Sequence, residues 1–168
     1  INCVGGGSSA YGFWSEFIDF PKSQIELIGV EAGGPKSSKL HAAPLSRGAK
    51  LGVLHGAASY VCQNNEGQIN ETESISAGLD YPSVSPMHCY LKDTKRARYT
   101  YATDEDALKA YQMVTKFEKL NPSLEPSHAF AEAIRIAPKL SRDTIIIVNS
   151  CGDAKKDRDI LRERLGKN

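Results

Sequence analysis

The chain has 168 residues and a mass of 18.3 kDa, and its 21 Lys and Arg nearly balance its 20 Asp and Glu, for a net charge of +1. Hydrophobic residues make up 40% and charged residues 24%, which is typical of a soluble globular protein. The near-neutral charge argues against a nucleic-acid partner, and no apolar run reaches the roughly 20 residues that span a bilayer, so we expect no membrane association. This length predicts a single domain over residues 1–168.

The four cysteines are scattered along the chain and form no CxxC pair: they are Cys3, Cys62, Cys89 and Cys151. This pattern is typical of reduced thiols, and no signal peptide precedes the first residue, so we expect a cytoplasmic location. The chain opens inside an apolar segment directly before a glycine cluster. We therefore expect it to be the C-terminal portion of a longer, two-domain polypeptide.

The first third of the chain predicts a β-turn-α-β unit. Its parts are a buried strand over residues 1–4, a turn over 5–9, an amphipathic helix over 10–20 and a strand over 25–30. Such a unit makes two parallel strands with a right-handed crossover. The predicted fold class is α/β, a three-layer open, mostly parallel sheet flanked by helices.

The remaining elements are less regular. Residues 31–50 and 74–88 are expected to be loops, and the turn signal at 64–67 predicts a hairpin near the apolar segments 51–54 and 57–62. Helices are expected over 104–120, capped by Thr103 and Asp106, over 127–137 and over 155–165. The β-branched segment Thr144–Val148 predicts a central strand.

The turn Gly5-Gly6-Gly7-Ser8-Ser9 carries the strongest chemical signal. A strand enters and a helix leaves, so free N–H groups and the helix dipole converge on one point that glycine leaves open to an anion. A phosphate cradle is the favoured interpretation. A turn that only allows close packing is the structural alternative. The same residues fit G-x-G-x-x-A with Glu31 after the next strand, so a NAD-type dinucleotide site also remains open.

Three further sites are weaker. Asp80 lies in a loop rich in Gly, Ser and Pro, where capping a turn is the usual role of an aspartate. Glu125 precedes a helix and could serve as a cap. Residues 149–153 follow the predicted strand, so their side chains would reach the same sheet edge as the glycine cluster. No spacing of His, Cys, Asp or Glu predicts a metal site.

Taken together, these stretches resemble the C-terminal half of the tryptophan synthase beta chain family, pyridoxal-phosphate enzymes of fold type II. The resemblance runs nearly end to end. The blocks that carry it, in chain order, are VGGGSSA, LIGVEAGG, HAAPLSRGAKLGVLHG, SISAGLDYPSVSPMHCYL, ATDEDALKAY and LEPSHAFAEA. The SISAGLDYPSV block is the most distinctive.

The resemblance implies pyridoxal 5'-phosphate as cofactor. The residues it assigns to cofactor binding are Gly5, Gly6, Gly7, Ser8, Ser9, Glu125, Ser150 and Cys151. Ser9 stands where the family usually has Asn, and Cys151 falls on the serine that meets the pyridine nitrogen, with Ser150 adjacent as the alternative. A thiol could still donate weakly to that nitrogen. The GRGDKD part of this block is largely lost.

The family reaction condenses L-serine with indole to give L-tryptophan and water. The resemblance implies that Asp80 handles the substrate hydroxyl and that backbone carbonyls of Gly5, Tyr81 and Ser83 hold a monovalent cation, Na⁺ or K⁺. Segment 51–69 resembles the part that lines the indole route near the alpha chain. An alpha chain partner and a beta-beta homodimer are therefore expected of the full-length protein.

The Schiff-base lysine of the family sits in a His-Lys-x-Asn motif that this chain lacks, so we expect the full-length enzyme to be active and this segment alone to be inactive. Two alternatives remain open from the residues. One is a non-catalytic relic or binding module, suggested by Ser9 and the eroded GRGDKD block. The other is the NAD-dependent oxidoreductase built on the glycine turn and Glu31.

Overall fold

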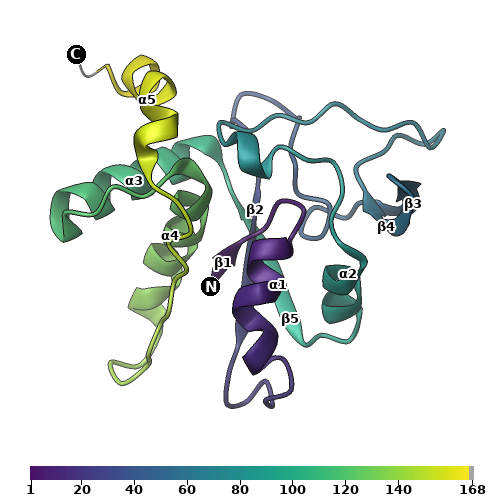
Figure 1. Ribbon diagram of the computed structural model, residues 1–168, viewed down its shortest axis with the longest axis horizontal. Helices are drawn as coiled ribbons and strands as arrows, with labels where there is room; N and C mark the ends of the chain where they lie inside the picture. Colours follow the sequence, from purple (N-terminus) through teal and green to yellow (C-terminus); the bar gives the residue numbers. More distant parts are fainter. Residues whose placement is uncertain (167–168) are drawn as a thin grey trace.

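The computed structural model describes residues 1–166 and shows an α/β fold with a parallel sheet flanked by helices, as expected (Figure 1). The sheet has the order β1 (Asn2–Cys3), β2 (Leu27–Ala32) and β5 (Ala97–Ala102), with both neighbouring pairs parallel. A 2.8 Å hydrogen bond from Val4 N to Val30 O continues the first pair up to the start of the glycine turn. The predicted β-turn-α-β unit is thereby confirmed.

Helices cover both faces of this sheet. On one face α1 (Ser8–Trp14) and α2 (Pro86–Asp93) enclose a core that includes Val4 and Leu27, while α4 (Leu124–Ile136) covers a core on the other face that includes Cys3 and Val30. Side chains of neighbouring strand residues point to opposite faces, which is why Cys3 and Val4 enter different cores.

The C-terminal helices form a second packing unit on α4. Both α3 (Asp104–Glu118) and α5 (Arg158–Leu165) lie on this side of the molecule, and short 3₁₀ turns η3 (Ala137–Lys139) and η4 (Ala154–Asp157) connect the region (Figure 1). A small core that contains Leu124 and Leu161 joins the elements. The charged terminal helix expected over 155–165 is thus split into η4 and α5.

An antiparallel hairpin lies on the opposite side of the molecule (Figure 1). It consists of β3 (Lys50–Leu54) and β4 (Ala57–Val61), and its turn falls at His55 and Gly56. The turn predicted at 64–67 does form, but it closes only the single bridge between Gln63 and Ile69. The turn at 64–67 was therefore predicted correctly, but it joins a single bridge and not two strands.

Sequence reasoning was wrong about Thr144–Val148, which is not a central strand. The segment lies at the sheet edge beside Ile1, whose amino group donates to Ile147 O at 2.8 Å and whose carbonyl accepts from Asn149 N at 3.1 Å. Ile145 is 85% exposed. Among residues 1–166 no strand pairs with the side of this segment that faces away from Ile1. A β-branched composition thus indicates a preference for extended backbone, and it does not show that the segment is buried.

Two elements were missed. Strand β5 reads ARYTYA, in which Arg98 and two tyrosines hide the apolar pattern, and α2 begins at Pro86 inside the segment expected to be a loop. Proline at the first helical position is a start signal, and Ser85 accepts a hydrogen bond from Met87 N as its cap. No helix within residues 1–166 is long and apolar enough to cross a membrane.

The predicted capping box of α3 is present and is testable. Thr103 Oγ1 accepts from Asp106 N at 3.3 Å, and Asp106 Oδ2 accepts from Thr103 N at 3.2 Å. We expect Thr103→Ala to lower the free energy of unfolding by about 1 kcal/mol in urea titrations. The matched control is Thr144→Ala, at an exposed threonine, with an expected change below about 0.5 kcal/mol. Equal losses in both variants would contradict the assignment.

Candidate functional site

The glycine turn follows the carboxyl end of β1, and in it the carbonyls of Gly6 and Gly7 are held while the amides are free. Ser85 N donates to Gly6 O at 2.9 Å, and His88 Nε2 lies 2.7 Å from Gly7 O. Among residues 1–166, the N–H groups of Gly6, Gly7 and Ser8 have no acceptor. The predicted phosphate cradle therefore has donors that point away from the protein's own hydrogen-bond network.

His88 is the residue that holds this turn, and sequence reasoning missed it. Its side chain is fully buried, and its ring packs edge-on against Trp14 with 5.6 Å between centroids. Since a carbonyl can only accept, Nε2 carries the proton toward Gly7 O, and Nδ1 accepts from Tyr99 Oη at 2.7 Å. Burial lowers the pKa of His88, which keeps this neutral tautomer.

Two glycines of the turn are required by their surroundings. Gly7 has a φ of +97°, in the left-handed region, and a Cβ there would overlap the ring of His88. A Cβ on Gly5 would lie 2.5 Å from Gly78 O. In contrast, a Cβ on Gly6 would meet no atom within 4 Å, so this position faces open space. Ser8 and Ser9 lie exposed on the first turn of α1.

Glu125 reaches the same region from the first turn of α4. Its Oε1 accepts from Gly78 N at 3.0 Å and from Lys156 Nζ at 2.7 Å. Burial opposes its ionisation, but the hydrogen bond from Lys156 and other donors outweigh that penalty, and the pKa of Glu125 falls to about 2. Its second oxygen, Oε2, is buried without a partner among the described residues. Glu125 is therefore a carboxylate with one free buried acceptor beside the glycine turn.

Cys151 completes the cluster. Its Sγ lies 3.6 Å from the Sγ of Cys3 on β1. The Cys3 thiol and, to a smaller extent, the Ser9 hydroxyl favour the thiolate and lower the pKa of Cys151 to about 6. The neighbouring Ser150 is exposed and makes no hydrogen bond with a described residue. Of the two adjacent candidates, Cys151 is the one whose side chain lies beside the glycine turn.

The remaining predicted residues lie on the loop between β4 and α2, which meets the glycine turn at Gly78 and Ser85. Asp80 is exposed and directly follows the 3₁₀ turn η2 (Ala77–Leu79). Tyr81 Oη lies 2.9 Å from His55 Nδ1, and Ser83 is buried, with its hydroxyl donating to Tyr60 O at 3.3 Å.

The backbone carbonyls proposed to hold a cation lie along this loop and the glycine turn. Within residues 1–166 the carbonyls of Gly5, Tyr81 and Ser83 accept no hydrogen bond. No group of three or more His, Cys, Asp or Glu side chains in this part of the chain could hold a metal ion.

Glu31, the acid of the alternative dinucleotide site, is committed elsewhere. It is 1% exposed, and its two oxygens accept from Leu45 N at 3.0 Å and from Ser46 N at 2.7 Å. The Ser46 hydroxyl donates to it as well, at 2.6 Å. Glu31 thus closes the long loop after β2 and has no oxygen left for a ribose.

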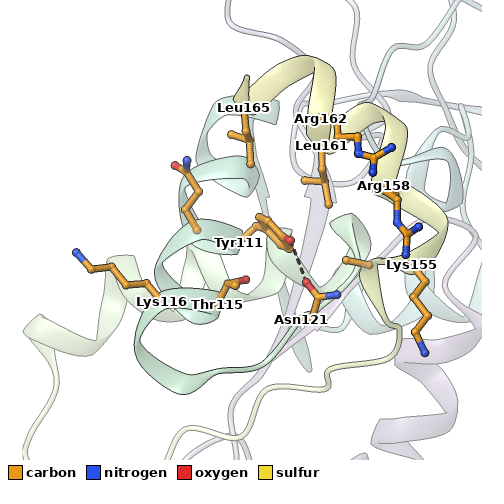
Figure 2. Close-up of a pocket in the computed structure, with 11 residues that line it drawn as sticks. Tyr111, Thr115, Lys116, Asn121, Lys155, Arg158, Leu161, Arg162 and Leu165 are labelled. Atoms are coloured by element: carbon orange, nitrogen blue, oxygen red, sulfur yellow. Dashed lines mark hydrogen bonds between the residues drawn. The ribbon is translucent and has the colours of Figure 1, made fainter. Parts of the chain in front are cut away.

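A groove of about 720 Å³ lies between α3 and α5 (Figure 2). Tyr111 and Asn121 are joined across it by a 2.9 Å hydrogen bond, and basic side chains such as Arg158 and Arg162 lie along one side. None of the predicted site residues contributes to its lining. Size alone therefore does not locate the candidate site.

Comparison with known proteins finds the same family that the sequence blocks resemble. The chain is 49% identical to the tryptophan synthase beta chain of Chromobacterium violaceum over 94% of its length, 49% identical to that of Bordetella petrii over 99%, and 51% identical to the tryptophan synthase beta chain 1 of Chlamydia caviae over 94%. The chain resembles the C-terminal part of tryptophan synthase beta chains. The predicted resemblance is thereby confirmed.

The chain matches only part of the length of each of these relatives. The chain spans 39%, 41% and 38% of the length of the three tryptophan synthase beta chains. No family model matches the sequence.

Solved structures confirm the predicted fold class. The threonine deaminase of T.th. superposes with a TM-score of 0.56 at 16% identity, over 84% of this chain and 44% of the deaminase. The L-serine ammonia-lyase of Rhizomucor miehei superposes with a TM-score of 0.64 at 17% identity, over 98% of this chain and 48% of the lyase. At these identities the likeness concerns the fold alone.

Glu31 yields a testable pH dependence. Burial raises its pKa from 4.5 to about 7, so the folded state holds the proton more tightly than the unfolded state. Its contribution to stability is complete below pH 4.5 and is lost as the pH rises through 7. We expect the free energy of unfolding, taken relative to Glu31→Gln, to fall by roughly 2–3 kcal/mol over this range in urea titrations. The control Glu163→Gln, at an exposed residue of α5, should show no such slope, and a flat difference for Glu31→Gln would refute the expectation.

Proposed function

We propose that this chain is the cofactor-phosphate-binding portion of a pyridoxal-phosphate enzyme that condenses L-serine with indole to give L-tryptophan and water. One observation carries the proposal: the free amides of the glycine turn, the carboxylate of Glu125 and the sulfur of Cys151 meet in one cluster. The sequence similarity to tryptophan synthase beta chains supports it. We further propose that residues 1–168 form one α/β domain of the longer protein, although residues 167–168 lie outside the described part of the chain.

The residues present fit the cofactor. The phosphate would lie against the amides of Gly6, Gly7 and Ser8, where glycine leaves space and the amino end of α1 favours negative charge. The ring would lie between Glu125, whose buried Oε2 has no partner within residues 1–166, and Cys151, whose sulfur lies beside the thiol of Cys3 and the hydroxyl of Ser9. When bound, pyridoxal phosphate supplies an electron sink for bond breaking at the amino acid.

Cys151 would face the pyridine nitrogen. As a thiol it donates a hydrogen bond to that atom, and as a thiolate it can only accept one. Because its pKa is lowered to about 6, Cys151 acts mainly as an acceptor at neutral pH. Cys3, whose pKa is raised by its bond to Cys151 and by burial, remains protonated behind it.

Asp80 would bind the substrate hydroxyl. It is exposed and lies two residues from Gly78, whose N–H binds Glu125, so its carboxylate belongs to the same loop that borders the cofactor site.

The carbonyls of Gly5, Tyr81 and Ser83, which lack hydrogen-bond donors in the described chain, would hold the monovalent cation. A cation there would fix the loop against the glycine turn.

The partners follow from the same resemblance. We propose that the β3–β4 hairpin, on which Leu51 and Val53 are exposed, belongs to the side that faces an alpha chain, and that the full-length protein forms a beta-beta homodimer in the cytoplasm. The dinucleotide alternative loses its support because Glu31 is buried and fully hydrogen-bonded.

The glycine turn gives a direct test of cofactor binding. We expect Gly6→Ala to weaken pyridoxal phosphate binding at least about tenfold, because a methyl group would enter the space left for the phosphate and break one charged hydrogen bond. Gly12→Ala is the matched control, since Gly12 also has no atom near its missing Cβ but lies away from the turn. Equilibrium dialysis of both variants measures the effect. Equal binding of pyridoxal and pyridoxal phosphate would contradict a phosphate cradle.

Asp80 tests the reaction. In the whole protein that contains this chain, we expect tryptophan formation from L-serine and indole, and we expect Asp80→Asn to lower kcat/KM for L-serine by at least about tenfold through loss of a charged hydrogen bond to the hydroxyl. Asp143→Asn, at an exposed residue outside the cluster, serves as control. A protein that binds the cofactor yet forms no tryptophan would favour the non-catalytic relic.

A further inference from the structure

Two cysteines far apart in the sequence are held side by side by the sheet. Cys3 belongs to β1, and Cys151 follows the edge segment that pairs with Ile1 through hydrogen bonds of 2.8 Å and 3.1 Å. Their sulfur atoms lie 3.6 Å apart. A disulfide requires about 2 Å between the sulfurs, so a shift of roughly 1.5 Å would join them.

The segment that carries Cys151 can supply this shift. Residues 144–152 adopt no helix or strand, and Cys151 is exposed, whereas Cys3 is 5% exposed within the sheet. The accessible sulfur of Cys151, outside any helix or strand, thus lies next to the buried sulfur of Cys3 in the sheet. This arrangement differs from a structural disulfide, in which both cysteines are set in the closed geometry, because here both thiols are free.

The two thiols also differ in reactivity. The hydrogen bond between the two sulfurs lowers the pKa of Cys151 to about 6, while the same bond and burial raise the pKa of Cys3. The thiolate is the nucleophile in cysteine oxidation. At neutral pH the exposed member of the pair is therefore the reactive one, and the buried member keeps its proton until the second step.

We propose that Cys151 is a site of reversible oxidation by hydroperoxides, with Cys3 as the thiol that closes the disulfide. In the first step the Cys151 thiolate attacks the peroxide and the O–O bond breaks, which gives sulfenic acid and an alkoxide or hydroxide that takes a proton from solvent and leaves as an alcohol or water. In the second step the Cys3 sulfur displaces hydroxide from the sulfenic acid, and the hydroxide takes up the proton of Cys3 and leaves as water. Overall two thiols lose two electrons and two protons to the peroxide, and a dithiol reverses the reaction.

The consequence for the cofactor rests on the proposed function. A Cys3–Cys151 disulfide would remove the sulfur that faces the pyridine nitrogen and would draw residue 151 toward β1. Oxidation would then lower cofactor affinity, and bound cofactor would shield Cys151 from the peroxide.

The other two cysteines provide internal controls. Cys62 and Cys89 are buried, and neither forms a hydrogen bond with a second cysteine within residues 1–166. Burial raises the pKa of Cys62 to about 11, so its thiolate is scarce at neutral pH. Neither should react under conditions that oxidise Cys151.

The test uses the full chain, reduced, freed of reductant and treated with one equivalent of hydrogen peroxide at neutral pH. We expect the number of free thiols to fall from four to two, the mass to fall by two hydrogen atoms, and peptide mapping without reductant to link Cys3 to Cys151. In Cys3→Ala the sulfenic acid at Cys151 should persist and be captured by dimedone. In Cys151→Ser the remaining thiols should oxidise at least about tenfold more slowly, whereas Cys62→Ser and Cys89→Ser should behave as the unaltered chain does.

A link that involves Cys62 or Cys89, a disulfide between two chains in place of the internal one, or unchanged thiol loss in Cys151→Ser would each overturn the proposal. Circular dichroism of every variant before oxidation shows whether it folds, and dimedone labelling of the unaltered chain supplies the Cys151 readout if Cys3→Ala does not. Repeating the oxidation with pyridoxal phosphate separates the two proposals. A disulfide that forms at the same rate with the cofactor present supports oxidation and contradicts the cofactor placement, whereas cofactor binding without any internal disulfide contradicts oxidation alone.

Discussion

The hydrogen bond from His88 to the carbonyl of Gly7 is the contact on which the candidate site depends. Together with the bond from Ser85 N to Gly6 O, it turns the carbonyls of Gly6 and Gly7 into the protein and leaves the amides outside. The neutral tautomer of His88 is fixed in turn by Tyr99 from β5. The orientation of the glycine amides is therefore determined by buried residues that would not themselves contact the ligand.

This dependence links the two faces of the sheet. His88 and Trp14 lie on the face covered by α1 and α2, whereas Glu125 comes from α4 on the opposite face. The two sides meet where β1 ends, because Gly5 and Gly78 allow the chain segments to approach within contact distance. A site at the carboxyl end of a parallel strand thus uses groups from both layers, as open α/β sheets generally permit.

Local signals predicted the glycine turn, whereas the roles expected of Asp80, Glu125 and Cys151 came from the family resemblance, and long-range packing accounts for what was missed. The glycine turn and the capping box of Thr103 are defined by neighbouring residues, so both were found. Strand β5 was not predicted, because its tyrosines and Arg98 mask the alternation of apolar and polar residues that marks a strand. His88 gave no signal because its role requires Gly7, 81 positions earlier.

The same distinction explains the ambiguous positions. Sequence could not choose between Ser150 and Cys151, whereas the fold places the sulfur of Cys151 beside that of Cys3 on β1. It also left Glu31 as a possible ligand for a ribose, and only the fold shows that Leu45 and Ser46 use its oxygens. Composition likewise suggested a central strand at Thr144–Val148, although burial depends on neighbours that composition does not describe.

The bare outer edge of Thr144–Val148 has a consequence for how this chain behaves in concentrated solution. Its backbone groups point outward beside Ile145 and Ile147, which are 85% and 61% exposed, and the segment contains no proline or lysine to discourage pairing. Unprotected β-branched edges are templates for intermolecular strand addition. Covering this edge with another polypeptide segment would suppress aggregation and, at the same time, steady the nearby backbone that carries Cys151.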